Sequence, residues 1–224
     1  MKEETMHIAN GNYIVIEGNI GAGKTSLSKL LSTDLNARLI LEEFSDNPFL
    51  PLFYKNAERY AFPVELFFMT ERHKQLQDLL MKGNLFQKYV VSDYIFSKTL
   101  LFAGQNLVDE ELRLFQRLFH TLNASFPKPH LLVYLHRSVD NLLTNIYKRG
   151  RAYEQDISAA YLSKIQNAYF DFFRMVEHDL SILVLDVEGL DFINNPEHYQ
   201  MVVQQIEKKY SKGLHHWKLE PSKN

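Results

Sequence analysis

Residues 13–31, YIVIEGNIGAGKTSLSKLL, have the types and spacing needed to bind phosphate. An apolar run leads into a glycine-rich turn, which is followed by Lys24, Thr25 and a helical leucine pattern. Gly18, Gly23, Lys24 and Thr25 match G-x-x-x-x-G-K-[ST], the phosphate-binding loop, in its strand–loop–helix setting. Loop amides and the helix start attract a polyphosphate. The predicted ATP- and Mg²⁺-binding loop comprises Gly18, Asn19, Ile20, Gly21, Ala22, Gly23, Lys24, Thr25 and Ser26.

Carboxylates follow two further apolar runs. Glu42 comes after LIL, where it could accept a proton from an attacking hydroxyl; the alternative is a solvated loop acid. Asp93 ends VVSD, a place where P-loop enzymes keep a carboxylate near Mg²⁺. Asp186, at the end of ILVLD, competes for that role. These residues predict phosphoryl transfer to an acceptor that loses a proton.

A basic segment, KRGRAYEQ, spans residues 148–155. Arg149 and Arg151 could stabilise transferring phosphoryl oxygens through charge-assisted hydrogen bonds. Alternatively, they are cations favoured at a helix C-terminus before Gly150. The chain has no N-K-x-D guanine motif, which argues against a regulatory GTPase. A kinase that acts on a separate acceptor explains more of these residues than an NTP-driven motor.

The elements that position these residues alternate along the chain. Strands are expected at Tyr13–Glu17, Arg38–Glu42, Tyr89–Ser92, Leu131–Leu135 and Ile182–Asp186, with helical patterns between them. Such alternation predicts an α/β fold: a five-stranded parallel sheet flanked by helices on both faces. Sites in such sheets lie beyond the carboxyl ends of the strands, where the candidate residues stand. We expect one domain over residues 1–210 and a polar C-terminal tail over 211–224.

Composition excludes several other classes of protein. The 224 residues are 46% hydrophobic with a net charge of −2, which suits a globular domain without a nucleic-acid partner. The absence of cysteine excludes disulfides and thiolate metal sites and suits a cytoplasmic protein. Neither a signal peptide nor a membrane span is expected.

Taken together, GNIGAGKT, DNPFLPLFY, KRGRAYEQ and AAYLSKIQNAYFDFF resemble the deoxynucleoside kinase family, and DNPFLPLFY resembles its bacterial branch. The resemblance runs from about Tyr13 to Phe192. It implies a P-loop kinase fold, a homodimer, and transfer of the γ-phosphate of ATP to the 5′-hydroxyl of a deoxynucleoside for nucleotide salvage.

The resemblance also implies roles for individual residues. Glu42 corresponds to the general base, and Asp93 to the acid of an E/D-R-S motif near the metal. Arg149 and Arg151 correspond to the lid arginines of the family. Together with Lys24, they are the further catalytic groups that the resemblance implies. Tyr54 and Glu154 correspond to the pair that binds the 3′-hydroxyl, and a site built to bond a hydroxyl rejects analogues that lack it. Asp191 and Phe192 loosely match a loop near the adenine of the donor.

The chain departs from the family pattern at three positions. Tyr94 stands in place of the motif arginine, and Lys98, one helical turn on, could supply a cation in its place. Ala103 aligns with the base-stacking phenylalanine, so that Phe96 or Phe102 would have to substitute. These departures leave two alternatives open: a weakly catalytic nucleotide-binding partner subunit, and a nucleoside monophosphate kinase.

The third departure is Glu65, which replaces the base-reading glutamine. Glu65 and Arg72 are seven residues apart and can share one side of a helix. An ionised glutamate only accepts hydrogen bonds, and guanine offers it two adjacent donors while O6 and N7 accept from Arg72. We therefore expect a purine deoxynucleoside to be favoured, with deoxyguanosine first. Alternatively, Glu65 and Arg72 pair with each other.

Overall fold

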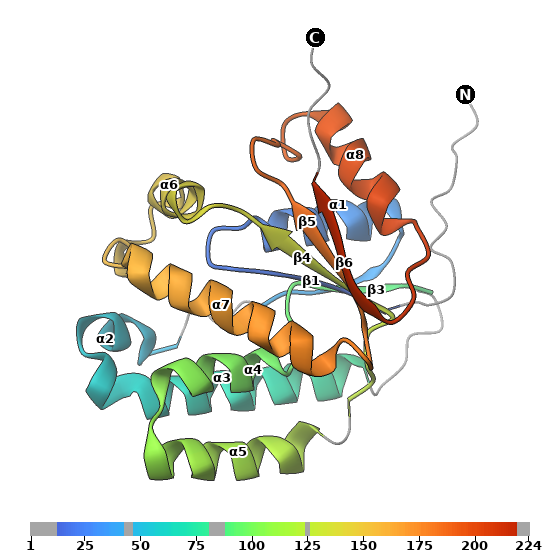
Figure 1. Ribbon diagram of the computed structural model, residues 1–224. Helices are drawn as coiled ribbons and strands as arrows, with labels where there is room; N and C mark the ends of the chain where they lie inside the picture. The colour runs from blue at the N-terminus through green and yellow to red at the C-terminus, as the bar shows by residue number, and fades with distance from the viewer. Residues whose placement is uncertain (1–12, 43–46, 81–87, 124–125, 219–224) are drawn as a thin grey trace.

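A parallel sheet of six strands forms the centre of the computed structural model, which describes residues 13–42, 47–80, 88–123 and 126–218 (Figure 1). The strand order is β2-β3-β1-β4-β5-β6, and every neighbouring pair is parallel. The strands are β1 (Tyr13–Gly18), β2 (Arg38–Ile40), β3 (Val90–Ser92), β4 (Leu131–His136), β5 (Ser181–Asp186) and β6 (Gly213–Lys218).

The predicted fold class is confirmed, with one strand more than the five expected. The additional strand, β6, comes from the segment that we assigned to a polar tail, and it pairs with β5 from Ser181↔Gly213 to Asp186↔Lys218. Its sequence, GLHHWK, lacks the apolar run of a buried strand because it lies at the sheet edge, where its side chains are largely exposed.

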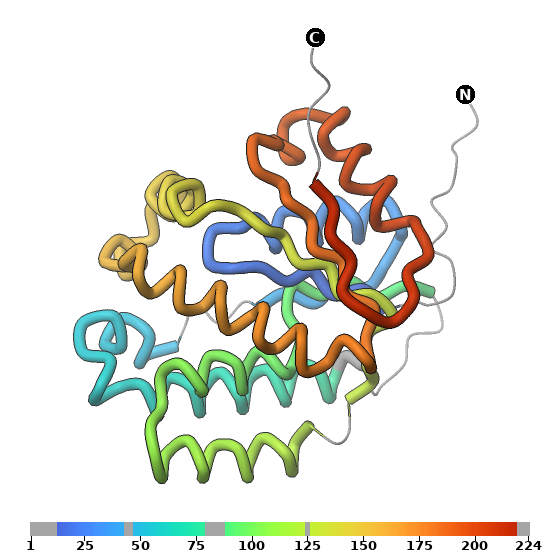
Figure 2. The backbone as a smooth tube through the Cα atoms, viewed as in Figure 1, coloured from blue at the N-terminus to red at the C-terminus, as the bar shows by residue number. Residues whose placement is uncertain are grey.

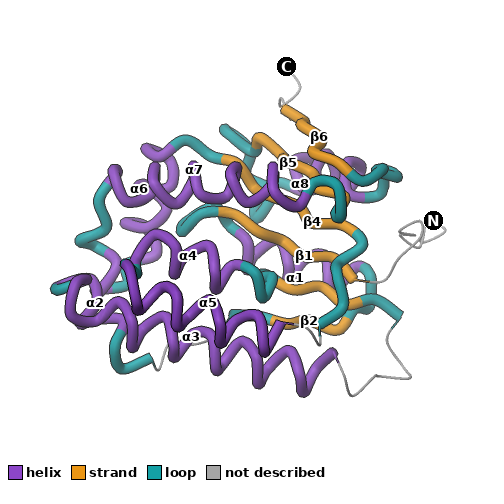
Figure 3. The backbone as a smooth tube through the Cα atoms, turned by 60° about the horizontal axis from the view of Figure 1, so that its bottom comes forward, coloured by secondary structure: helices purple, strands orange, loops and turns teal. Residues whose placement is uncertain are grey.

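Helices cover both faces of this sheet (Figures 1 and 3). On one face lie α1 (Lys24–Asp34) and α8 (Pro196–Ile206). On the other, α7 (Ala159–Val176) runs beside α4 (Lys98–Asn106), with α3 (Ala57–Leu80) and α5 (Asp109–Asn123) packed against α4 (Figure 2). The remaining helices are α2 (Leu50–Lys55), α6 (Val139–Arg149) and a 3₁₀ turn, Ala152–Glu154.

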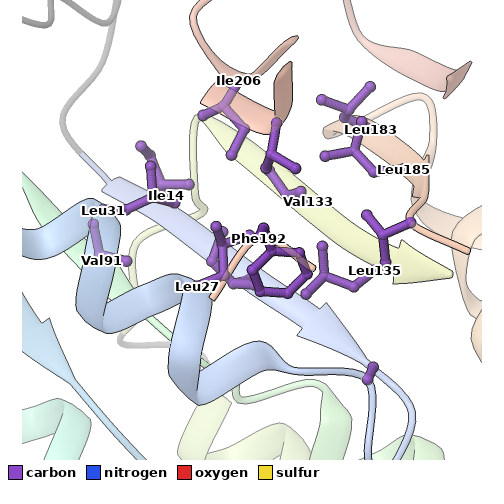
Figure 4. Close-up of a cluster of buried hydrophobic side chains, with 14 of the residues drawn as sticks. Ile14, Leu27, Leu31, Val91, Val133, Leu135, Leu183, Leu185, Phe192 and Ile206 are labelled. Carbon is purple, nitrogen blue, oxygen red and sulfur yellow. The ribbon is translucent and has the colours of Figure 1, made fainter. Parts of the chain in front are cut away.

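The hydrophobic core follows the alternation of side chains along the strands. In β4, Val133 and Leu135 face the cluster that contains Leu27 of α1 and Ile206 of α8 (Figure 4), whereas Tyr134 faces α7. Both faces of the strand are therefore buried, as is usual for a parallel sheet between helices. This packing holds the carboxyl ends of β1 and β3 in fixed positions.

Helix ends that the sequence indicated are present. Gly150 ends α6 in the left-handed conformation with φ of 70°, and Asn195 caps α8 through its side chain, which accepts from the N–H groups of Glu197 and His198. Gly83, where a glycine in the sequence would favour the end of α3, lies outside the described residues. Pro63 lies inside α3, in its second turn, where a proline is better tolerated than in mid-helix. No helix in the described part of the chain is long and apolar enough to cross a membrane.

Candidate active site

The phosphate-binding loop joins β1 to α1 and is closely packed. Gly21 and Gly23 have φ of 83° and 100°, and a Cβ at Gly23 would lie 2.9 Å from Cζ of Phe192. Lys24 folds over the loop, and its Nζ donates to the carbonyl oxygens of Gly18 and Asn19, 3.0 Å from each. Burial, with Lys98 nearby, lowers the pKa of Lys24 to about 8. The loop thus presents backbone N–H groups and a cation to a phosphate chain.

Asp93, directly after β3, links this loop to the end of β2. Its Oδ2 accepts from the hydroxyl of Thr25 at 2.6 Å, and its Oδ1 accepts from the backbone N–H of Glu42 at 2.7 Å. Burial, and the negative charge of Glu42, raise the pKa of Asp93. Hydroxyl and carboxylate oxygens are ligands that Mg²⁺ prefers, so Thr25 and Asp93 fit the metal role assigned to them. Asp186 instead accepts from the N–H of Glu188 and does not line the cavity described below.

Two cations hold Glu42. Arg72 of α3 donates through Nε at 2.8 Å and Nη2 at 2.5 Å to Oε1, while Lys98 of α4 donates to Oε2 at 2.6 Å. Burial favours the protonated form of Glu42, but Arg72 and Lys98 outweigh it and keep the pKa well below its usual range. Glu42 is therefore an ionised carboxylate with a fixed orientation. The next residue, Glu43, is also a carboxylate and lies outside the described residues.

The basic segment forms a second ion-pair cluster around Glu154, which is only 5% exposed. Arg149 donates to Oε2 of Glu154 through Nε at 3.0 Å and Nη2 at 2.5 Å, and Arg151 lies 3.3 Å from Oε1. Tyr54 of α2 stacks on Tyr153, with ring centroids 6.3 Å apart. Burial raises the pKa of Tyr54 well above its usual value, so its hydroxyl stays protonated. The two lid arginines and the proposed sugar-binding pair are thus adjacent.

Glu65 occupies the apolar end of the site and is 3% exposed. Its Oε1 accepts from Nδ2 of Asn106 at 2.6 Å, whereas Oε2 is buried without a hydrogen-bond partner. Burial is the main cause that raises the pKa of Glu65 to about 7. A buried acceptor without a donor is unfavourable, and a donor on a bound ligand would relieve it. Sequence reasoning missed Asn106, whose place near Glu65 depends on how α4 packs against α3.

Arg72 differs from the prediction. It does lie on the same helix as Glu65, but its Nε and Nη2 go to Glu42 and its Nη1 donates to the hydroxyl of Thr99 at 2.9 Å. Among the described contacts it therefore belongs to the Glu42 cluster and makes no hydrogen bond to Glu65, although it also lines the cavity described below. Helical spacing indicated the face of α3 on which Arg72 lies, but not its partner Glu42, which follows β2.

The structure also shows where the residues at the positions that depart from the family pattern lie. Tyr94 is fully buried, and its hydroxyl donates to Oε1 of Gln75 in α3. Lys98 is 5% exposed, so it is a buried cation and not a solvated one on the helix surface. Phe96 stacks on Phe119 in the core, centroids 5.3 Å apart, whereas Phe102 lines the cavity. Of the two phenylalanines, Phe102 is thus the one placed to contact a base.

These groups surround one cavity of about 520 Å³. Its described lining runs from the phosphate-binding loop to the apolar end and includes Ile20, Lys24, Thr25, Glu42, Phe53, Tyr54, Val64, Glu65, Phe68, Arg72, Asp93, Lys98, Phe102, Asn106, Arg149, Arg151, Tyr153, Glu154 and Tyr161. Asp191 and Phe192 are not among them: Phe192 is buried against Gly23, and Asp191 accepts from the backbone N–H groups of Ile193 and Asn194. The cavity thus joins cations, an ionised base and apolar walls.

Comparisons with known proteins agree with this arrangement. The chain is 33% identical over 201 residues to the deoxyguanosine kinase of Bacillus subtilis (strain 168), covering 87% of this chain and 95% of that one. It is 31% identical to the deoxyadenosine kinase of Dictyostelium discoideum, covering 88% and 80% of the two chains. A solved structure of deoxyadenosine kinase from M. mycoides superposes with a TM-score of 0.74 at 22% identity, covering 87% of this chain and 98% of that chain. The model of the deoxynucleoside kinase family matches residues 14–211, and the chain belongs to this family.

Proposed function

We propose that the protein transfers the γ-phosphoryl group of Mg²⁺-bound ATP to the 5′-hydroxyl of a deoxynucleoside. One observation carries this proposal: a single cavity joins Lys24 of the phosphate-binding loop to the ionised carboxylate of Glu42 and to the polar groups beyond it. The relatives from Bacillus and Dictyostelium are named deoxyguanosine kinase and deoxyadenosine kinase, and this supports a purine deoxynucleoside as the acceptor.

The donor is held by the loop. Lys24, which now donates to Gly18 and Asn19, would exchange those carbonyls for phosphate oxygens, which are stronger acceptors for a cation. Thr25 and Asp93 would hold Mg²⁺, whose charge offsets that of the phosphates. Arg149 and Arg151 would contact the transferring group once they leave Glu154.

Glu42 acts as the general base. As the 5′-oxygen forms its bond to the γ-phosphorus and the bond to the β-phosphate oxygen breaks, the hydroxyl proton passes to Glu42 and ADP leaves. Arg72 and Lys98 keep the carboxylate ionised and oriented, so it can accept that proton without first losing one. The low pKa makes Glu42 a weak base. The proton therefore moves to Glu42 after the forming bond to the γ-phosphorus has made the attacking hydroxyl acidic.

Glu65 and Asn106 select the base. The unpartnered Oε2 of Glu65 accepts from the N1–H and exocyclic amine of guanine, and Phe68 and Phe102 supply apolar walls. Tyr54 and Glu154 bind the sugar 3′-hydroxyl. We propose further that the chain acts as one kinase domain that includes β6, and that the enzyme is a homodimer, as the family resemblance implies. A chain without cysteine suits the cytoplasm, where we propose that it works.

The test is a phosphorylation assay with purified protein, Mg²⁺-ATP, the four deoxynucleosides and their monophosphates. We expect transfer to deoxynucleosides, deoxyguanosine first, and its loss in Lys24→Ala, because the cation that binds the outer phosphates is removed. Lys209→Ala, which changes an exposed lysine after α8 that does not line the cavity, is the matched control. ATP binding without transfer to any nucleoside would favour a partner subunit instead. Phosphorylation of monophosphates would favour a nucleoside monophosphate kinase. Such an enzyme needs cations for the acceptor phosphate, whereas Arg72 and Lys98 are both paired with Glu42.

A further inference from the structure

Glu17 is a fully buried carboxylate near the end of β1. It immediately precedes Gly18 but is not one of the described residues that line the cavity. A buried charge is unfavourable unless several partners compensate for it. A buried carboxylate next to the phosphate-binding loop therefore suggests a function that none of the groups described above performs.

Three donors from three parts of the chain converge on this carboxylate. Oε2 accepts from the backbone N–H of Gly18 at 3.3 Å and from the hydroxyl of Tyr169, in α7, at 2.8 Å. Oε1 accepts from the backbone N–H of Ile95 at 3.0 Å. Glu17 thus ties the first residue of the phosphate-binding loop to the segment that leads from β3 into α4.

That segment carries Lys98. The backbone N–H of Lys98, the first residue of α4, donates at 3.0 Å to the carbonyl of Ile95, whose own N–H is held by Glu17. From there the side chain of Lys98 reaches Oε2 of Glu42 at 2.6 Å. Burial raises the pKa of Glu17, and the nearby charges of Lys98 and Lys24 oppose that effect. A continuous set of contacts therefore runs from the donor loop to the general base.

We propose that Glu17 is a positioning residue that fixes Lys98, and through it Glu42, relative to the phosphate-binding loop. The proposal rests on the kinase function stated above. In a transfer between two bound substrates, the two halves of the site must keep their separation, and small misplacements lower the rate strongly while leaving each substrate bound. Glu17 joins these halves through backbone N–H groups on both sides, beside the link that Asp93 makes between Thr25 and Glu42.

The experiment is a double-mutant cycle on kcat with Glu17→Gln and Lys98→Ala, measured with the best nucleoside. Glutamine keeps the volume but loses the charge, and its amide N–H₂ cannot accept from Ile95 or Gly18. We expect Glu17→Gln to lower kcat by about 10-fold or more, with the Kd for ATP changed by less than about 3-fold. If Glu17 acts through Lys98, the double variant should lose little more than Lys98→Ala alone.

Tyr134→Phe is the matched control, because its ring lies 5.0 Å from that of Tyr169 in the same buried cluster without bonding to Glu17. Its kcat should equal that of wild type. Glu17→Asp, which keeps the charge but shortens the reach, tests the same idea if the glutamine variant fails to fold, and it should show the same non-additive loss.

Losses that multiply in the double variant, or a Kd for ATP that rises in step with the fall in kcat, would overturn the positioning role while leaving the kinase function intact. An unchanged kcat in Lys98→Ala would overturn it as well. Absence of transfer by the wild-type protein would instead refute the proposed function, on which this role depends.

Discussion

The protonation state of Glu65 should decide which purine the enzyme prefers. The ionised carboxylate only accepts, which suits the N1–H and amine of guanine; the protonated form also donates, which suits N1 of adenine. Burial and Glu42 favour protonation, whereas Asn106, Arg72 and Lys98 oppose it, and the resulting pKa is about 7. Tyr161 of α7 also faces this carboxylate. Low pH should therefore favour deoxyadenosine, and high pH deoxyguanosine.

The size of the effect follows from a single ionisation. Between pH 6 and pH 8, the ratio of ionised to protonated Glu65 rises about 100-fold around a pKa of about 7. If each form serves one base, kcat/KM for deoxyguanosine relative to deoxyadenosine should rise by up to about the same factor. Competition between both nucleosides in one reaction is the proper assay, because pH effects on shared groups such as Lys24 and Glu42 then cancel.

Glu65→Gln is the control, because an amide does not titrate in this range. Its preference should move toward deoxyadenosine or deoxycytidine and stay flat with pH. A flat ratio in the wild type, or an equal slope in Glu65→Gln, would refute the reasoning. So would a wild-type preference for thymidine or deoxycytidine.

The same pKa predicts a stability effect. A carboxyl group whose pKa rises from 4.5 to about 7 on folding destabilises the fold as pH rises between those values, by about 3 kcal/mol once fully ionised. Glu65→Gln should therefore gain stability relative to wild type between pH 5 and pH 8 in denaturant unfolding without nucleoside. A difference that does not change with pH would mean that Glu65 titrates near its ordinary pKa.

Two further predictions concern the Glu42 cluster. Glu42→Gln should lower kcat by about 10²–10⁴-fold with the Kd for ATP preserved, whereas the exposed carboxylate variant Glu111→Gln should match wild type; a small loss would mean that another group takes the proton. Lys98→Ala should reduce kcat much more than ATP binding, because it leaves Oε2 of Glu42 without its cation; equal losses in both would place Lys98 in donor binding.

Local patterns predicted the parts of the site that a short segment encodes. The loop around Lys24 and the end of α6 at Gly150 depend on residues next to one another in sequence, and both are confirmed. The placement of Asp93 and Glu42 at one edge of the sheet also followed, because parallel strands end together.

What sequence did not predict depends on how helices pack. Arg72 was assigned to the base because it shares a helix face with Glu65, but its partner, Glu42, comes from another element. Asn106 and Tyr94 likewise acquire their partners, Glu65 and Gln75, across helix–helix contacts. Helical periodicity gives the direction of a side chain around its own axis, not the identity of the neighbour that it meets.

The ion pairs of Arg149 and Arg151 with Glu154 have a consequence for the order of events. While Glu154 holds both guanidinium groups, its single negative charge offsets part of their positive charge, and they are weaker partners for a phosphate. A sugar hydroxyl that bonds to Glu154 competes for the same oxygens and loosens the arginines. On the proposed function, occupancy by the acceptor would thereby free the two arginines for the donor. This dependence of the arginines on acceptor binding would disfavour transfer of phosphate to water when no nucleoside is present.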